Sequence, residues 1–349
     1  MLLCLTVRCL QYAAWRFRLG LFLENEKVRQ ADFKTRSQYF SAAARADGIY
    51  KKRPRPFCIP VPCAEENLFQ GIRETAIAYF RKREIRWHDG QNGKPSNHLC
   101  DSQVCCLNFL FAFANRSSAL AELLRPVFPS IRMMLPMEDD KFVACEWIGA
   151  KNYLNERVPR SGARTRGANC TSADAAIMFE RTDGKRQIVL IEWKYTESYS
   201  NICLTTAKSG TNRTAIYRPI FDASQCPIDR APLRDFESLF YEPFYQFMRQ
   251  QFLAHKMELA NEQGADIVTV LHIAPAHNRA FRRVTSPQLA SIDETATGVW
   301  SRLAGDGFMS VSTEELFGPA LRVGLVGMTD WSDYVLQRYP WVGEVRPAV

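Results

Sequence analysis

Two carboxylates and one ammonium group stand at the ends of two apolar runs. Asp174 opens the run "DAAIMFE", and Glu192 and Lys194 close the run "QIVLIEWKY". Because strand side chains alternate between faces, Glu192 and Lys194 point to the same side of the second run. Two carboxylates held close together repel each other unless a cation lies between them, and hard divalent cations take oxygen ligands. The pattern indicates either a metal site built on Asp174 and Glu192 or a structural Glu192–Lys194 ion pair at a strand end.

The turn "TDG", residues 182–184, decides whether the two carboxylates meet. A two-residue turn places Asp174 opposite Trp193 and sends Glu192 to the other face. A three-residue turn needs Gly184 in the left-handed conformation of a bulge and places Asp174 directly opposite Glu192. Directly opposed residues have Cβ atoms about 4.5–5.5 Å apart. We predict the three-residue turn with a positive φ at Gly184.

Further strands and helices surround this expected hairpin. Helical spacing extends over 65–83, over 95–114 with 118–125, and over 235–262, where Pro243 lies near the first position of the main part; buried strands are expected at 142–148, 174–180, 187–195 and 266–274. The order is therefore helix, three strands, helix, strand. This order predicts an α/β sandwich with helical additions on both sides.

Asp174 followed by Glu192-x-Lys194 resembles the signature of the PD-(D/E)XK nuclease superfamily. The stretches "SQVCCLNFL", "TSADAAI", "LIEWKYTESY" and "EPFYQFMRQQFLA" are most similar to uncharacterised bacterial proteins described as restriction endonucleases. Ala173 replaces the proline that precedes the acid in the motif. The resemblance implies a restriction-endonuclease-like αβββαβ core, a mixed sheet flanked by helices, with helical N- and C-terminal additions. It also implies Mg²⁺-dependent hydrolysis of DNA phosphodiester bonds by an endonuclease of restriction or defence type.

Four spans are expected on this reading. Residues 1–62 form an N-terminal extension that ends in the basic, proline-broken linker "KKRPRPFCIPVP". A helical region over 63–141 leads into the nuclease core at 142–274, and an α/β addition packed on the core occupies 275–349.

The chemistry of phosphodiester hydrolysis gives the three motif residues their expected roles. Asp174, Glu192 and the backbone carbonyl of Trp193 would hold Mg²⁺, with Mn²⁺ as a substitute. Lys194 would orient or deprotonate the attacking water and neutralise developing charge. One more acid is expected as a further ligand, either Glu146 on the preceding strand or its competitor Glu122 on the first core helix, and the sequence leaves this choice open.

Two further sets of residues are candidates around the site, with exposed surface as the alternative for the helix and the basic loop and strand capping as the alternative for the tyrosines. Gln246 and Gln250, with Arg249 on the same helical stripe, are expected to support it. Contacts to nucleic acid are expected from a basic loop and from an aromatic residue after the motif, namely Arg160, Arg164, Arg166 and Tyr195, with Tyr199 and the cluster at 81–86 as further candidates.

Composition narrows the setting of this chemistry. The chain has 349 residues, 46% of them apolar, a formal net charge of +8 and an odd number of cysteines, eleven. We expect reduced thiols and a cytoplasmic protein without a signal peptide or membrane span, and the positive charge weakly favours phosphate-bearing or other acidic partners. The resemblance implies that this partner is DNA. A homodimer and a methyltransferase or other defence partner stay open. Two rival hypotheses are an inactive nucleic-acid-binding module of the same fold and a zinc-organised interaction domain built on the cysteines and histidines at 58–106.

Overall fold

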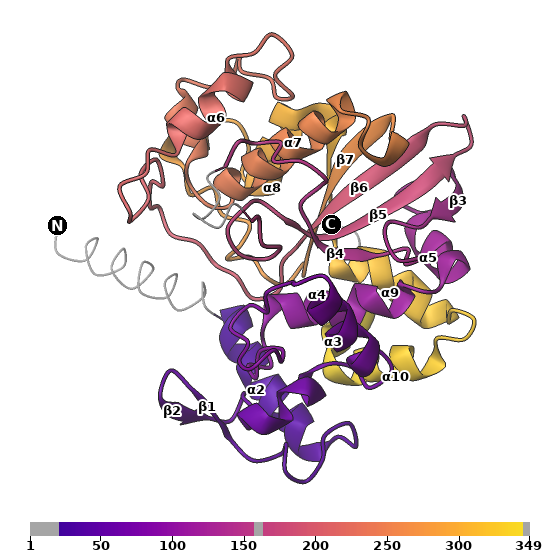
Figure 1. Cartoon of the computed structure of the whole chain (residues 1–349). Helices are drawn as coiled ribbons and strands as arrows, with labels where there is room; N and C mark the ends of the chain where they lie inside the picture. The colour runs from indigo at the N-terminus through magenta and orange to yellow at the C-terminus, as the bar shows by residue number, and fades with distance from the viewer. Residues whose placement is uncertain (1–20, 157–162, 345–349) are drawn as a thin grey trace, which may run out of the picture.

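A mixed six-stranded sheet forms the centre of the computed structural model, which describes residues 21–156 and 163–344 (Figure 1). The strands of this sheet are β3 (Ile131–Leu135), β4 (Ala144–Trp147), β5 (Ala173–Arg181), β6 (Arg186–Trp193), β7 (Ile267–Ala274) and β8 (Phe308–Ser312). The strand order is β3-β5-β6-β7-β8, and β4 also pairs with β5. Pairing is antiparallel from β3 and β4 through β5 to β6, and parallel from β6 through β7 to β8. The hairpin β5–β6 therefore lies at the middle of the sheet.

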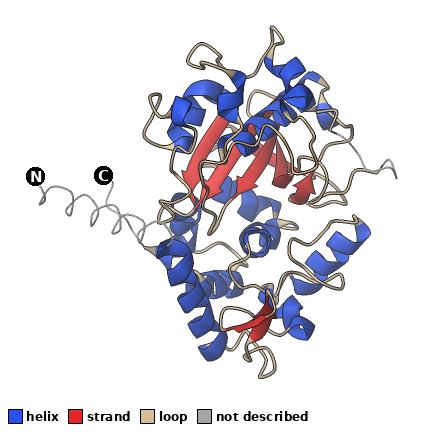
Figure 2. Ribbon diagram, turned by 90° about the vertical axis from the view of Figure 1, so that its left-hand side faces the viewer, coloured by secondary structure: helices blue, strands red, loops and turns tan. Residues whose placement is uncertain are grey.

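Helices cover both faces of this sheet (Figures 1 and 2). One face carries α2 (Leu21–Arg36), α3 (Arg73–Lys82), α4 (Ser102–Leu110), α5 (Ser117–Leu124), α9 (Thr313–Val323) and α10 (Thr329–Arg338). The other carries α6 (Thr214–Phe221), α7 (Phe244–Leu259) and α8 (Ala296–Ala304). A separate two-stranded sheet pairs β1 (Gly48–Tyr50) with β2 (Arg53–Arg55).

Alternation along β6 explains why this strand is apolar on both sides. Val189, Ile191 and Trp193 are buried in the core on the α4 face. Ile188 and Leu190 are buried in the core on the α7 face. Both faces of a central strand are covered, so the run reads as continuously apolar. A charged residue at the end of such a strand must find partners within the protein.

The predicted three-residue turn between β5 and β6 is confirmed. The amide of Arg181 donates to the carbonyl of Lys185 at 2.8 Å, and the amide of Gly184 donates to the carbonyl of Arg181 at 3.0 Å. Gly184 has a φ of +82°. The register that follows pairs Ala175 with Ile191, so the next pair along the hairpin is Asp174 and Glu192.

The expected α/β class, with a mixed sheet and flanking helices, is also confirmed. The expected order from the first core helix to the last strand is found in α4, β4, β5, β6, α7 and β7. The sequence patterns did not locate α2, α6, β1 or β3, nor the individual elements of the expected C-terminal α/β addition, α8, β8, α9 and α10. The single helix expected over 65–83 is interrupted, because Leu68 is extended and α3 begins only at Arg73. The segment expected as a linker contains β2.

The edge of the sheet beside β5 is made by two short strands in succession. β3 pairs with the half of β5 near the turn, and β4 pairs with the half near Asp174. The connection between them carries Glu138, which binds Arg166, and Asp139. β4 ends beside Asp174, with Trp147 paired to Ala173.

The two ends of the described chain share one apolar core with the sheet. Phe33 of α2, Phe109 of α4, Trp193 of β6 and Trp341 belong to the same buried cluster. The four spans expected from the sequence stay predictions; the sheet itself includes β3 and β8, which lie outside 142–274. Within the described ranges, no single helix is both long and apolar enough to cross a membrane, and one bent pair, Ser102–Phe113 with Ser117–Leu124, reaches that limit only jointly.

Candidate active site

The β5–β6 hairpin brings Asp174 and Glu192 together at the end opposite its turn. Beyond the register, the amide of Trp193 donates to Asp174 Oδ2 at 2.7 Å. Asp174 is therefore held by the backbone of the strand that carries Glu192. The local cause is the turn chemistry of Gly184, since a turn one residue shorter would turn Glu192 to the other face.

Glu192 and Lys194 form a buried ion pair at the end of β6. Lys194 Nζ lies 2.6 Å from Glu192 Oε1, and the side chains are only 7% and 5% exposed. Gln250 of α7 donates from Nε2 to Glu192 Oε2 at 2.8 Å and to the carbonyl of Ser172 at 2.7 Å. Both oxygens of Glu192 thus have a donor from the protein, and Gln250 links α7 to the start of β5. Gln246, one helical turn earlier, instead accepts from the Tyr199 hydroxyl at 3.4 Å.

The third acid at this point is Glu146 of β4. Its side chain accepts from Gln103 Nε2 at 2.7 Å and from Ser172 Oγ at 2.7 Å. Its backbone has a φ of +49°, which is unusual for a residue with a side chain. Glu122, the competitor, is exposed on α5. Gln103 and Ser172 were missed by the sequence, because neither residue type nor spacing marks them as partners of an acid.

Burial and mutual repulsion shape the protonation of this cluster. Burial raises the pKa of Asp174 well above its usual range; Glu192 and Glu146 raise it further, whereas Lys194 opposes the shift. Burial also raises the pKa of Glu146, against the hydrogen bonds from Gln103 and Ser172. Burial lowers the pKa of Lys194, but Glu192 and, more weakly, Tyr199 and Asp174 outweigh it, so that pKa is raised. Lys194 is therefore a cation, and three carboxyl groups, two of them with raised pKa values, face one ammonium group.

The oxygens of Asp174, Glu192 and Glu146 are chemically suited to bind a divalent cation, but protein groups already bind them. An excess of buried carboxylates over cations is the environment that a hard divalent ion stabilises. Within residues 21–156 and 163–344, no three histidine, cysteine, aspartate or glutamate side chains are arranged as a ready metal cage. Two of the acids already have protein partners. Lys194 and Gln250 bind the Glu192 carboxylate, and Gln103 and Ser172 donate to Glu146. A cation ligated here would take its oxygens from these donors.

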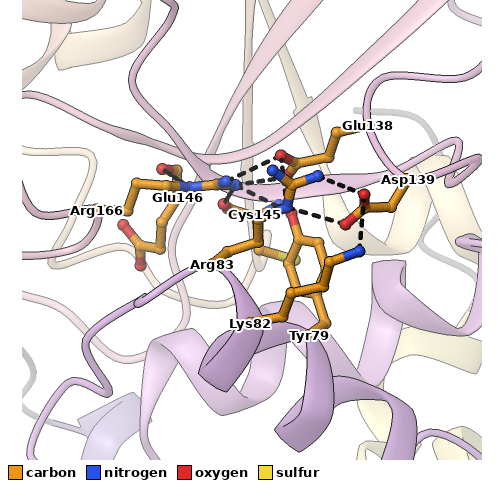
Figure 3. Close-up of polar contacts among 8 residues, drawn as sticks. All are labelled: Tyr79, Lys82, Arg83, Glu138, Asp139, Cys145, Glu146 and Arg166. Atoms are coloured by element: carbon orange, nitrogen blue, oxygen red, sulfur yellow. Dashed lines mark hydrogen bonds and ion pairs between the residues drawn. The ribbon is translucent and has the colours of Figure 1, made fainter.

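Most of the residues expected to contact DNA instead form hydrogen bonds to groups within the protein. Arg164 donates to the backbone carbonyls of Ile148, Gly149 and Lys151 at 2.6–3.0 Å. Arg166 is 9% exposed and bonds to Glu138, to Tyr79 and to backbone carbonyls (Figure 3). Tyr195 is fully buried, and its hydroxyl donates to Glu26 and accepts from Gln30.

These contacts correct the expected roles of Arg164, Arg166 and Tyr195. The hydroxyl of Tyr195, the guanidinium of Arg166 and both Nη atoms of Arg164 bind protein partners, which leaves little of these groups for a phosphate or a base. Arg160 lies outside the described residues. Arg249 likewise faces inward, donating to Thr171 Oγ1 at 3.3 Å and lying over the ring of Tyr245.

The cysteines and histidines at 58–106 form core and surface contacts rather than a ligand set. Cys58, Cys100, Cys105 and Cys106 are buried, and burial raises the pKa of each thiol. Within residues 21–156 and 163–344, no three of these side chains lie together as a zinc site requires. The zinc-organised domain therefore gains no support from the described part of the chain.

Fold and site together define an α/β protein with a buried acid–lysine cluster at the end of a central hairpin. The model of the family described as restriction endonuclease associating with ARP matches residues 24–340, and the chain belongs to this family. The resemblance to restriction endonucleases is thus confirmed at the level of the family. No curated protein and no solved structure matches the chain.

Proposed function

We propose that this protein is a Mg²⁺-dependent endonuclease that hydrolyses DNA phosphodiester bonds in a restriction or defence system. The observation that carries the proposal is the meeting of Asp174 and Glu192 across the hairpin, with Lys194 buried beside them. Membership in a family described as restriction endonucleases supports the substrate and the reaction class. The same description names association with ARP, so a protein partner of that kind is part of the proposal.

A structural ion pair alone explains this arrangement poorly. An isolated buried Glu–Lys pair is often no more stable than apolar residues of the same volume. Here two more acids, Asp174 and Glu146, add repulsion that Lys194 cannot cancel. Such a cluster is costly to the fold, and costly clusters of perturbed groups concentrate at functional sites.

The chain's own residues would divide the work as follows. Asp174, Glu192 and the carbonyl of Trp193 would hold Mg²⁺, with Glu146 as the further acid, and Gln250 would fix the Glu192 carboxylate. Bound Mg²⁺ would supply Lewis-acid stabilisation of the charge that develops on the phosphate. Lys194, whose pKa is raised, would orient the attacking water and stabilise negative charge rather than remove a proton.

The test is incubation of purified protein with supercoiled plasmid in Mg²⁺, in Mn²⁺ and in chelator. Open-circular and linear products that need a divalent ion, and that Asp174→Asn abolishes, would support the proposal. Intact plasmid in all conditions with retained DNA binding would favour the inactive binding module instead. Equal cleavage by wild type and Asp174→Asn would place the activity elsewhere or in a contaminant.

A further inference from the structure

Arg166 is the centre of a polar network at the edge of the sheet, beside the candidate site. Its Nη1 and Nη2 atoms bond to both oxygens of Glu138 at 3.1 and 2.8 Å, and Nη2 also lies 3.0 Å from the Tyr79 hydroxyl (Figure 3). Its Nε donates to the carbonyl of Glu146 at 3.0 Å, and Nη2 donates to the carbonyl of Cys145. One guanidinium thus joins α3, the β3–β4 connection and β4.

The two carbonyls that Arg166 holds belong to consecutive residues of one strand. In a regular strand, consecutive carbonyls point to opposite sides, one toward each neighbouring strand. Cys145 obeys this rule: its amide donates to the Tyr79 hydroxyl at 3.0 Å and its carbonyl accepts from Arg166, so both groups point away from β5. Glu146 should then turn its carbonyl toward β5. Instead its carbonyl also faces Arg166, and its φ of +49° is the backbone change that makes this possible.

Gly167, which follows Arg166 in the chain, lies against the side chain of Glu146. A Cβ atom at Gly167 would lie 3.3 Å from Glu146 Cδ and 2.9 Å from the carbonyl oxygen of Arg86. The amide of Arg86 also donates to the carbonyl of Arg166 at 3.0 Å. The Glu146 carboxyl group is therefore confined between Gly167, Gln103 and Ser172.

We propose that Arg166 is a positioning residue that holds the backbone of Glu146 in its left-handed conformation and so presents the third carboxylate to Asp174 and Glu192. The inference rests on the proposed function only in calling this cluster a catalytic site. It assigns to Arg166 a role in building the site, in place of the DNA contact that its sequence context indicated. Tyr79 assists by holding the amide of Cys145 and one oxygen of Glu138.

A comparison of glycine and alanine at position 146 tests the backbone directly and needs no metal. Both Glu146→Gly and Glu146→Ala remove the charge, so their difference reports the conformation. Glycine adopts positive φ freely, whereas alanine does not. With Arg166 present, Glu146→Gly should melt roughly 1–3 °C above Glu146→Ala. With Arg166→Lys, which cannot bridge the two carbonyls, the difference should vanish or reverse, because an ordinary strand favours alanine.

An unchanged glycine–alanine difference in the Arg166→Lys background would overturn the proposal. If Arg166→Lys does not fold, Tyr79→Phe provides the second background, since it keeps the ring and removes one contact to β4. There the difference should shrink by a smaller amount, and no change at all would again count against the network.

The metal response separates this inference from the proposed function. The Mn²⁺-induced rise in melting temperature should be smaller in Arg166→Lys than in wild type. A wild type that ignores Mn²⁺ would defeat the metal site of the proposed function, yet the glycine–alanine comparison would still decide the role of Arg166. A third outcome is a vanished glycine–alanine difference together with a normal Mn²⁺ response in Arg166→Lys. It would mean that Arg166 holds only the backbone of Glu146, and it would overturn the proposal that Arg166 positions the carboxylate for the site.

Discussion

At the scale of single residues, the site is defined by how each acid is held. Glu192 is bound on one oxygen by Lys194 and on the other by Gln250. Asp174 receives one backbone amide, from Trp193. Glu146 receives two side-chain donors. The acid with the fewest protein donors is thus Asp174, which makes it the one most open to a cation.

Replacing Lys194 by methionine should separate catalysis from stability. The variant leaves Glu192 buried without its cation, which costs about 3 kcal/mol or more of unfolding free energy. On the proposed function, cleavage should fall at least about 100-fold, because the charge assigned to stabilise the transition state is gone. Plasmid cleavage and chemical denaturation measure the two effects. Adding Glu192→Gln should restore stability without activity, and a folded Lys194→Met protein that cleaves like wild type would remove Lys194 from the mechanism.

Replacing Asp174 by asparagine should stabilise the protein in chelator. The pKa of Asp174 is raised in the fold, so the carboxyl costs nothing at low pH, and stability is lost as pH rises from about 4 through the folded pKa. The melting temperature of wild type should therefore fall below that of Asp174→Asn as pH rises.

The same variant should lose most of the stabilisation that millimolar Mn²⁺ gives to wild type, which is about 2.7 kcal/mol at a hundredfold excess over Kd. Asp183→Asn, exposed in the turn, is the matched control and should respond like wild type. A wild type indifferent to Mn²⁺, or an Asp174→Asn protein that responds fully, would favour a structural ion pair.

At the scale of elements, two glycines with positive φ, Gly184 and Gly167, have different structural roles. Gly184 has a φ of +82° in the hairpin turn, and a Cβ there would meet nothing within 4 Å. Gly167 has a φ of +73°, and a Cβ there would press on Arg86 and Glu146. The first glycine serves the register of β5 and β6, and the second serves the close approach of a loop to β4.

The variants Gly184→Ala and Gly167→Ala should distinguish these two structural roles. Both variants should lose about 1 kcal/mol of unfolding free energy from the left-handed conformation, and Gly167→Ala more because of the contacts. Only Gly167→Ala should also lower cleavage at saturating DNA, because it displaces the third carboxylate. Denaturation curves and cleavage rates of the pair provide the comparison. Equal cleavage by both would show that Glu146 is not needed where the structure places it.

At the scale of the molecule, a net charge of +8 favours association with nucleic acid, but the contributing residues must be exposed. Arg164 and Arg166 are committed to internal partners. Arg86 is exposed, and its carbonyl accepts from Gln103, the residue that holds Glu146. Arg86 is therefore a cation beside the site that is free to meet a phosphate.

Arg86→Ala should reduce the slope of log affinity against log salt by about one unit. Lys185→Ala is the matched control, because Lys185 is exposed in the turn, about seven residues and roughly 23 Å along the hairpin from Glu192. Binding titrations at several salt concentrations measure both slopes. Equal slopes for the two variants would mean that DNA does not approach the site past Arg86.

The sequence by itself determined the hairpin, its register and the meeting of Asp174 with Glu192. These features are local: the turn depends on Gly184, and alternation along β5 and β6 then places every side chain on a face. The α/β class and the order from α4 to β7 followed from the same periodicities. β3 and β8 lack such a pattern, because only Ile131 and Met134 of β3 and Phe308 and Ser312 of β8 are buried.

Only the tertiary structure decided which acid joins the pair and what the basic loop does. Glu146 and Glu122 are both acids on neighbouring elements, and the choice depends on how β4 ends beside β5. Arg164, Arg166 and Tyr195 have the same sequence pattern whether they face water or the interior. The orientation of Arg164 depends on carbonyls of the preceding segment, 148–151. Arg166 and Tyr195 are held by acids from other elements, Glu138 and Glu26, which come within hydrogen-bonding distance only when the sheet edge and α2 have packed.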